Sequence, residues 1–127
     1  MSKVNNSEKD FCLNHKLTSE GVRDVDPKEV QASAHLLKLV DVRRPEEFTG
    51  ELGHIESAKL VTLETQLQTF LNSASEEQKS APTVFVCRSG GRSTKAASMA
   101  QQSGFTNVYN MTGGMMYWNE LRLPVSK

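Results

Sequence analysis

A single cysteine that follows a short apolar run and precedes a glycine-rich loop constrains this chain more than any other feature. The run at 83–86 reads Thr-Val-Phe-Val, and the loop at 87–92 reads Cys-Arg-Ser-Gly-Gly-Arg. The next residues, 93–100, have the composition of a helix. A run without polar alternation is typical of a parallel strand that is buried on both faces. The sequence therefore predicts a strand, a tight loop and a helix, with Cys87 as the first loop residue.

The start of the predicted helix gives this loop an electrostatic role. Helix N-termini carry a partial positive charge and free N–H groups, and a tight loop turns further backbone N–H groups toward the same point. An anion is stabilised there, and that anion can be the thiolate of Cys87. Only the thiolate of a cysteine is an effective nucleophile, and helix ends and neighbouring cations favour it over the thiol. Cys87 is therefore the predicted catalytic residue.

The other loop residues suit the binding of a small oxyanion. Glycines allow the positive φ angles that such a loop needs, arginines attract anions, and serine hydroxyls donate hydrogen bonds. Each residue alone also has an ordinary explanation, since glycine pairs mark turns, serines cap helices and an arginine can point to solvent. Together, at the end of a strand, they form the predicted substrate-binding set: Arg88, Ser89, Gly90, Gly91, Arg92 and Ser93.

The rest of the chain alternates between strand-like and helix-like segments. Strands are expected at 22–25, 39–42, 58–61 and 107–111, in addition to 83–86. Helices are expected at 27–37, 45–48, 63–71 and 115–121, in addition to the helix after the loop. Asp26 and Pro27 form a helix start signal, as N-cap and first helical residue. This alternation predicts a three-layer α/β fold, with a central parallel sheet of about five strands flanked by helices.

Length and charge restrict the class of protein. A chain of 127 residues suits one domain, and we expect it at 21–127, after a polar leader at 1–20 that is flexible or loosely docked. The 15 basic and 15 acidic residues balance, which argues against a general nucleic-acid binder or a membrane-surface binder. No apolar run approaches the roughly 20 residues of a membrane span. No secretory signal and no disulfide are expected, so the prediction is a reduced, cytoplasmic protein.

Two residues are expected to support the loop from behind. Asp41 ends the strand beside the presumed central one, so it can brace the active loop, form an ion pair with Arg43 or cap the next turn. We keep Asp41 and Arg43 as supporting residues. Cys12 is either a resolving thiol for Cys87 or an ordinary residue of the leader. No metal ligands are expected, because no metal-binding spacing joins the cysteines to the three histidines, His15, His35 and His54.

Several further motifs resemble the rhodanese family of sulfurtransferases, in the order in which that family has them. The matching segments are Leu-Val-Asp-Val-Arg at 39–43, Pro-Glu-Glu-Phe at 45–48, Gly-His-Ile at 53–55, Gly-Phe-Thr-Asn-Val at 104–108, Gly-Gly-Met-Met-Tyr-Trp at 113–118 and Leu-Pro-Val at 123–125. The resemblance covers residues 22–125. The chain departs from the family pattern in turns, with Glu-Ser-Ala for Pro-Gly-Ala at 56–58, Leu60 and Thr62 for Asn and Pro, and Arg122 near a usual glycine.

This resemblance implies the rhodanese-like fold and a double displacement. The Cys87 thiolate would take the outer sulfur of a small anionic donor such as thiosulfate and become a persulfide. An acceptor, which is cyanide, a thiol or an acceptor protein, would then remove that sulfur. The resemblance implies no metal and no other cofactor, because the reaction needs an activated nucleophile and an anion hole.

The resemblance leaves other functions open, and loop length discriminates among them. Related phosphatases and arsenate reductases have Cys, five residues and then Arg, whereas sulfurtransferases have a loop shorter by one. Here Arg92 lies five positions after Cys87 and Ser93 follows, so the register favours sulfur transfer. The alternatives are a persulfide carrier that serves a partner protein, a cysteine-dependent phosphatase or arsenate reductase, and a non-catalytic interaction module.

Overall fold

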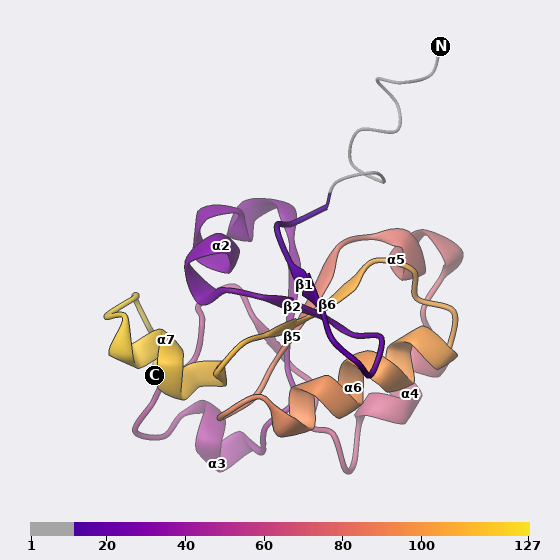
Figure 1. Ribbon diagram of the computed structural model, residues 1–127. Helices are drawn as coiled ribbons and strands as arrows, with labels where there is room; N and C mark the ends of the chain where they lie inside the picture. Colours follow the sequence, from indigo (N-terminus) through magenta and orange to yellow (C-terminus); the bar gives the residue numbers. More distant parts are fainter. Residues whose placement is uncertain (1–11) are drawn as a thin grey trace.

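A twisted sheet forms the middle of the protein (Figure 1). The computed structural model describes residues 12–127. The strand order is β1-β2-β6-β5-β3-β4. The strands are β1 (Lys16–Leu17), β2 (Arg23–Val25), β3 (Lys38–Asp41), β4 (Lys59–Leu60), β5 (Thr83–Val86) and β6 (Val108–Met111). Five of these strands pair in parallel, as expected, and β1 adds an antiparallel sixth strand at one edge.

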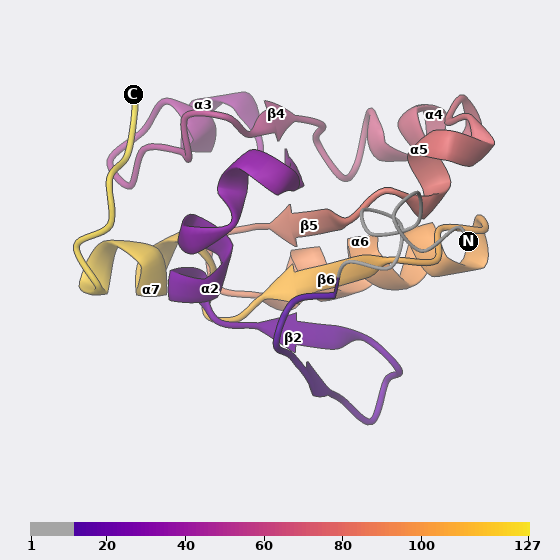
Figure 2. The same cartoon turned by 90° about the horizontal axis from the view of Figure 1, so that it is seen from above.

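Helices cover both faces of the sheet and give the three predicted layers (Figure 2). They are α2 (Pro27–Ala32), α3 (Pro45–Phe48), α4 (Leu67–Asn72), α5 (Glu76–Ser80), α6 (Gly91–Gln102) and α7 (Gly114–Glu120). Asp26 caps α2 as predicted, since its side chain accepts a hydrogen bond from the backbone N–H of Lys28. The helix expected at 27–37 is shorter, because α2 ends at Ala32 and a separate 3-10 turn covers Ala34–Leu36.

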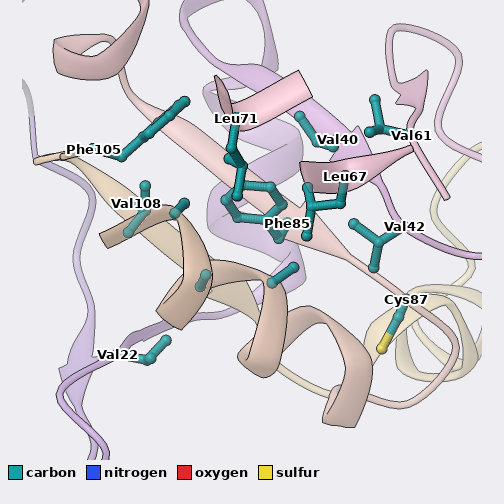
Figure 3. Packing of buried hydrophobic residues seen from close by; sticks show 13 residues of the cluster. Val22, Val40, Val42, Val61, Leu67, Leu71, Phe85, Cys87, Phe105 and Val108 are labelled. Carbon is teal, nitrogen blue, oxygen red and sulfur yellow. The ribbon is translucent and has the colours of Figure 1, made fainter. Parts of the chain in front are cut away.

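The alternation of side chains along β5 explains why the sheet has two apolar faces. Val84 and Val86 point into the cluster under α2 and α7, whereas Phe85 and Cys87 point into the cluster under α4 and α6. Every residue of β5 is buried, which matches its unbroken apolar sequence. Figure 3 shows the second cluster, with Phe105 at one end and Cys87 at the other. The nucleophile predicted from the sequence therefore lies at the end of the core.

The end of the expected leader contributes to this fold. Residues 1–11 of the leader lie outside the described part of the chain, but Leu13 is buried against the α2 and α7 face. Its backbone N–H donates to the Tyr109 hydroxyl at 3.2 Å. Strand β1 then pairs with β2, with Lys16 opposite Asp24. No helix among residues 12–127 combines the length and apolar character needed to cross a bilayer.

Candidate active site

Cys87 lies one residue beyond the C-terminal end of β5, where open α/β sheets place their functional sites. The residue is only 1% exposed, and its side chain also touches the apolar cluster under α6. Its sulfur nevertheless has polar partners. The backbone N–H of Gly90 donates to Sγ at 3.0 Å, and the Ser93 hydroxyl lies 3.2 Å from it. The Gly90 N–H provides a hydrogen bond for a thiolate inside an otherwise apolar environment, and the Ser93 hydroxyl lies beside it.

Gly90 produces the turn that directs the loop toward the sulfur. Its φ of +115° lies in a region that glycine adopts without the steric cost other residues incur. The turn brings α6 to a start at Gly91, so the N–H groups of Gly91, Arg92 and Ser93 form its first turn. The first N–H groups of a helix have no intrahelical acceptor. We expected several backbone amides on the sulfur, but among the described residues one amide, that of Gly90, donates to it, with the Ser93 hydroxyl alongside.

The N-terminus of α7 holds the outer side of the loop, which was not predicted from the sequence. The N–H of Met115 donates to the carbonyl of Cys87 at 2.8 Å, and the N–H of Met116 donates to the carbonyl of Arg88 at 3.0 Å. Gly114 allows this close approach, because a Cβ there would lie 2.5 Å from backbone atoms of Cys87 and Arg88. Helix α7 thus anchors these two carbonyls on one side of the loop, while the Gly90 N–H faces the sulfur.

The two loop arginines have different environments. Arg92 forms a bidentate ion pair with Glu47 of α3, with N···O distances of 2.8 and 2.9 Å. Arg88 is exposed, and its guanidinium contacts the sulfur of Met116 at 3.2 Å. Since a carboxylate offsets the charge of Arg92, Arg88 is the more available cation for an incoming anion. Glu47 belongs to the Pro-Glu-Glu-Phe motif at 45–48, but no feature of the sequence near it identified it as the partner of Arg92.

The predicted supporting residues form a buried ion pair rather than a direct contact with the loop. Arg43 donates to both carboxylate oxygens of Asp41, at 2.9 and 2.8 Å, and both residues are at most 1% exposed. Arg43 also donates to the carbonyls of Glu47 and Gly53. The pair therefore positions α3, and α3 in turn holds Arg92 through Glu47. A chain of contacts therefore links Asp41 to the loop through Arg43, Glu47 and Arg92.

A polar chain leads from the sulfur to the edge of the sheet. The Ser93 hydroxyl donates to the side-chain oxygen of Asn110 on β6. The side-chain amide of Asn110 donates in turn to the carboxylate of Asp24 on β2, at 3.0 Å. Asp24 and Asn110 are paired residues of the β2–β6 ladder. Nothing in the local sequence around Asp24 or Asn110 connects them with Cys87, because 63 residues separate Asp24 from Cys87.

Two cavities are candidates for substrate entry. One hollow of about 250 Å³ borders the loop and is lined by Arg43, Glu46, Glu47, Gly50, Glu51, Leu52 and Arg88. A larger cavity of about 510 Å³ lies near α2, α7 and the C-terminal segment, and no residue of the loop lines it. The smaller hollow is the relevant one, because it borders the loop that carries the nucleophile. Cys87, which is buried, lines neither of these cavities.

The other candidate residues lie away from the sulfur. His54 stacks on Phe48 with ring centroids 3.7 Å apart, and its backbone pairs with Ser126. Cys12 contacts His15 and Arg23 on the face opposite to the Cys87 sulfur, where Tyr109 also lies. Both cysteines are free, Cys12 exposed and Cys87 buried. Among residues 12–127 no group of histidines, cysteines and carboxylates forms a metal site.

The Glu47–Arg92 pair predicts a pH dependence of stability. The hydrogen bond from Arg92 lowers the pKa of Glu47 from 4.5 to about 2. A carboxyl group whose pKa falls on folding stabilises the protein above its unfolded pKa, and this contribution is lost as the pH falls to the folded pKa. Since the two side chains are 26% and 29% exposed, solvent weakens the pair. We therefore expect a contribution of about 1 kcal/mol at neutral pH.

Urea unfolding of the wild type and of Glu47→Gln tests this expectation. The wild type should be more stable by a constant amount above pH 4.5, and its advantage should disappear between pH 4.5 and about 2. The glutamine variant keeps the size and an acceptor oxygen, so it isolates the effect of charge. If the wild type were still more stable than Glu47→Gln by the same amount at pH 2, the Glu47–Arg92 ion pair would not be the source of the difference.

Comparisons with known proteins identify the family of this chain. The family model described as Rhodanese-like domain matches residues 26–121. Thiosulfate sulfurtransferase GlpE of Vibrio cholerae is 30% identical over 102 residues, which is 80% of this chain and 91% of that protein. The uncharacterized protein YqhL of Bacillus subtilis is 33% identical over 97 residues, which is 76% of this chain and 72% of that protein.

Solved structures also share the fold. A rhodanese-like domain protein from Staphylococcus aureus is 27% identical, with a TM-score of 0.66 and coverage of 82% of this chain and 98% of that one. A protein of unknown function from Rhodopseudomonas palustris, described as a possible tyrosine phosphatase, has a TM-score of 0.73 at 24% identity, covering 83% and 85% of the two chains. Since the family model spans most of the domain and the fold agrees, this chain belongs to the rhodanese-like domain family.

Proposed function

We propose that the protein is a sulfurtransferase that carries a sulfane sulfur as a persulfide on Cys87. The observation that carries this proposal is the environment of Sγ, which lies at the end of β5, before the N-terminus of α6, with the Gly90 N–H at 3.0 Å. A hydrogen-bonded sulfur in that position can be an anion before the reaction and after it. Its relationship to thiosulfate sulfurtransferases supports the same chemistry.

The proposed reaction has two displacements on sulfur. The Cys87 thiolate attacks the outer sulfur of thiosulfate, a new S–S bond forms, and the old S–S bond breaks so that sulfite leaves with the bonding electron pair. An acceptor thiolate or cyanide then attacks the outer sulfur of the persulfide, and the Cys87 thiolate leaves. The exposed cation of Arg88, beside the 250 Å³ hollow, attracts the anionic donor. A reducing compartment such as the cytoplasm keeps the thiol free for this chemistry.

Phosphoryl transfer is the second candidate, because one solved relative of the fold is described as a possible tyrosine phosphatase. A phosphatase needs a loop large enough for a phosphoryl group and an arginine free to bind it. In this protein the loop arginine is five positions after Cys87, and Glu47 binds it on both nitrogens. Hydrolysis of an aryl phosphate that disappears in Cys87→Ser would favour this candidate.

Intact-mass spectrometry after incubation with thiosulfate tests the sulfur-transfer proposal. We expect the reduced protein to gain the mass of one sulfur atom, and Cys87→Ala to gain none. Cys12→Ser is the matched control, because Cys12 is the exposed cysteine, has no contact with the loop in the described structure and should not affect loading. Absence of the adduct in folded, reduced wild-type protein would refute the proposal.

The rates at which the Cys87 persulfide is loaded and discharged separate a turnover enzyme from a persulfide carrier. A turnover enzyme should discharge its persulfide to cyanide as fast as thiosulfate loads it. A carrier should load rapidly from a cysteine desulfurase and discharge to an acceptor protein, while thiosulfate:cyanide turnover stays slow. Both outcomes keep Cys87 as the residue that holds the sulfur.

A further inference from the structure

In the chain of polar contacts behind Cys87, the Ser93 hydroxyl has one proton to donate but lies near several hydrogen-bond acceptors. The Ser93 hydroxyl has three possible acceptors, which are the Cys87 sulfur, the Gly90 carbonyl and the side-chain oxygen of Asn110. A hydroxyl has one proton, so it can serve one of them well. Ser93 is fully buried and Asn110 is 4% exposed, so water does not readily replace a missing partner. Which acceptor receives the Ser93 proton therefore decides whether the Cys87 sulfur has a second hydrogen-bond donor.

Asp24 decides how the Asn110 side chain is oriented. A carboxylate only accepts hydrogen bonds, so the Asn110 group that faces Asp24 must be the NH₂ group. The oxygen of Asn110 then faces Ser93 and can only accept. The Gly90 carbonyl already accepts from the N–H and the hydroxyl of Thr94. Since an amide oxygen is a stronger acceptor than a thiol sulfur, the Ser93 proton goes to Asn110.

We propose that Asp24 and Asn110 are positioning residues that hold the Ser93 proton away from Cys87 and so favour its thiol form at rest. The inference rests on the proposed function only in giving Cys87 its role. With the Ser93 proton on Asn110, the Ser93 oxygen faces Sγ as an acceptor, which suits an S–H group. Ionisation of Cys87 releases the proton to solvent. The thiolate then keeps the Gly90 N–H, and Ser93 can turn to it only by leaving the buried Asn110 oxygen without a donor.

The charges around this network are few. Lys16 of β1 is the register partner of Asp24, and both sit on an edge that solvent reaches. On the side of the sulfur the charged groups are Arg88 and Arg92 of the loop and Glu47 of α3, with Glu64 acting on Arg92. None of these four contacts Ser93 or Asn110 through a hydrogen bond found among the described residues. Changes at Asn110 therefore alter the acceptor of the hydroxyl proton without removing a hydrogen bond of these four groups.

Alkylation of Cys87 by iodoacetamide across a range of pH tests the proposal, with Cys12→Ser as the background for every variant. Asn110→Leu keeps a similar volume but removes the acceptor, which frees the Ser93 proton for the thiolate. We expect its alkylation rate at neutral pH to rise about tenfold, as one hydrogen bond to a charged group is gained. The asparagine of Asp24→Asn can present either end of its amide to Asn110, so the orientation of Asn110 is only partly lost. We expect a smaller rise in the alkylation rate, of about threefold, because the hydrogen bond from Ser93 to the thiolate is then gained in part.

Three controls separate this effect from a looser structure. Asp26→Asn is the matched exchange two residues away, keeps the helix cap and should leave the alkylation profile unchanged. Loosening would raise the rate at high pH, where all protein is thiolate, whereas a freed proton moves the half-maximal rate to lower pH and leaves that plateau as it is. In a Ser93→Ala background, Asn110→Leu should have no effect on the position of the profile.

An unshifted or upward-shifted profile in Asn110→Leu would overturn the proposal. The alkylation assay does not involve sulfur transfer. Failure of thiosulfate loading in the wild type would therefore refute the proposed function, whereas the role of Asp24 and Asn110 would still be decided by the alkylation profile. Conversely, normal loading with an unshifted profile would refute the role of Asp24 and Asn110 alone.

Discussion

Replacing Gly114 by alanine is expected to destabilise the protein by about 3–5 kcal/mol and to slow persulfide formation at Cys87 at least a hundredfold. Gly114 has a φ of +59°, which is costly for alanine, and its Cβ would lie 2.5 Å from the carbonyl groups of Cys87 and Arg88. These contacts are with backbone atoms, so no side chain can turn aside. Helix α7 must retreat, and its hydrogen bonds to the two carbonyls are lost.

Gly91→Ala is the matched control for this substitution. Gly91 belongs to the same loop, has no positive φ, and a Cβ there would meet no atom within 4 Å. As the first residue of α6 it should tolerate alanine, with unchanged or slightly higher stability. Urea unfolding and the rate of the thiosulfate mass gain would measure both effects. Equal stability of the two variants would show that α7 does not anchor the loop.

The second large effect is expected at the buried ion pair of Asp41 and Arg43. Asp41→Ala leaves a guanidinium that is 1% exposed without its carboxylate, although two carbonyls still accept from it. Breaking a buried pair from one side costs about 3–5 kcal/mol, because the remaining charge stays buried and uncompensated. The loss should also weaken α3, which Arg43 holds through the carbonyl of Glu47. Chemical unfolding of the variant measures the change.

Two further variants test the origin of this effect. The double variant Asp41→Ala with Arg43→Met should be less destabilised than the sum of the single variants, because no unpaired charge remains. Glu76→Gln removes a partner of Lys79 at 3.8 Å, where the glutamate side chain is 95% exposed, and should cause no measurable change. A similar loss in Asp41→Ala and Glu76→Gln would mean that burial is not the source of the cost.

The fold was predictable to the extent that it depends on local patterns. The apolar run at 83–86 is a buried strand of the sheet, and Asp26 caps α2, because burial and capping leave marks within a few residues. The short β1 was not predicted, since its two residues are exposed and carry no strand pattern. Its place is set by pairing with β2 and by burial of Leu13, which depend on distant residues.

The candidate site likewise has parts that local sequence patterns predicted and parts that depend on distant residues. The sequence predicted Cys87 and the loop, because a strand end, glycines and a helix start are contiguous. It did not predict that Arg92 pairs with Glu47, 45 residues earlier in the chain, or that Arg88 remains without a carboxylate contact in the described structure. Both arginines look alike in sequence. Only the position of α3 distinguishes them.

By itself, the sequence determined that a cysteine would end a buried strand and face the first turn of a helix, because hydrophobic burial and turn chemistry act over adjacent residues. The tertiary structure decided which groups share the protons and charges around that cysteine. Gly114, Glu47 and Asn110 contact residues 87–93 from three separate elements, and Asp24 acts from a fourth through Asn110. Their effects depend on distances of a few ångströms across the sheet, and hydrogen bonds and ion pairs weaken steeply beyond that range.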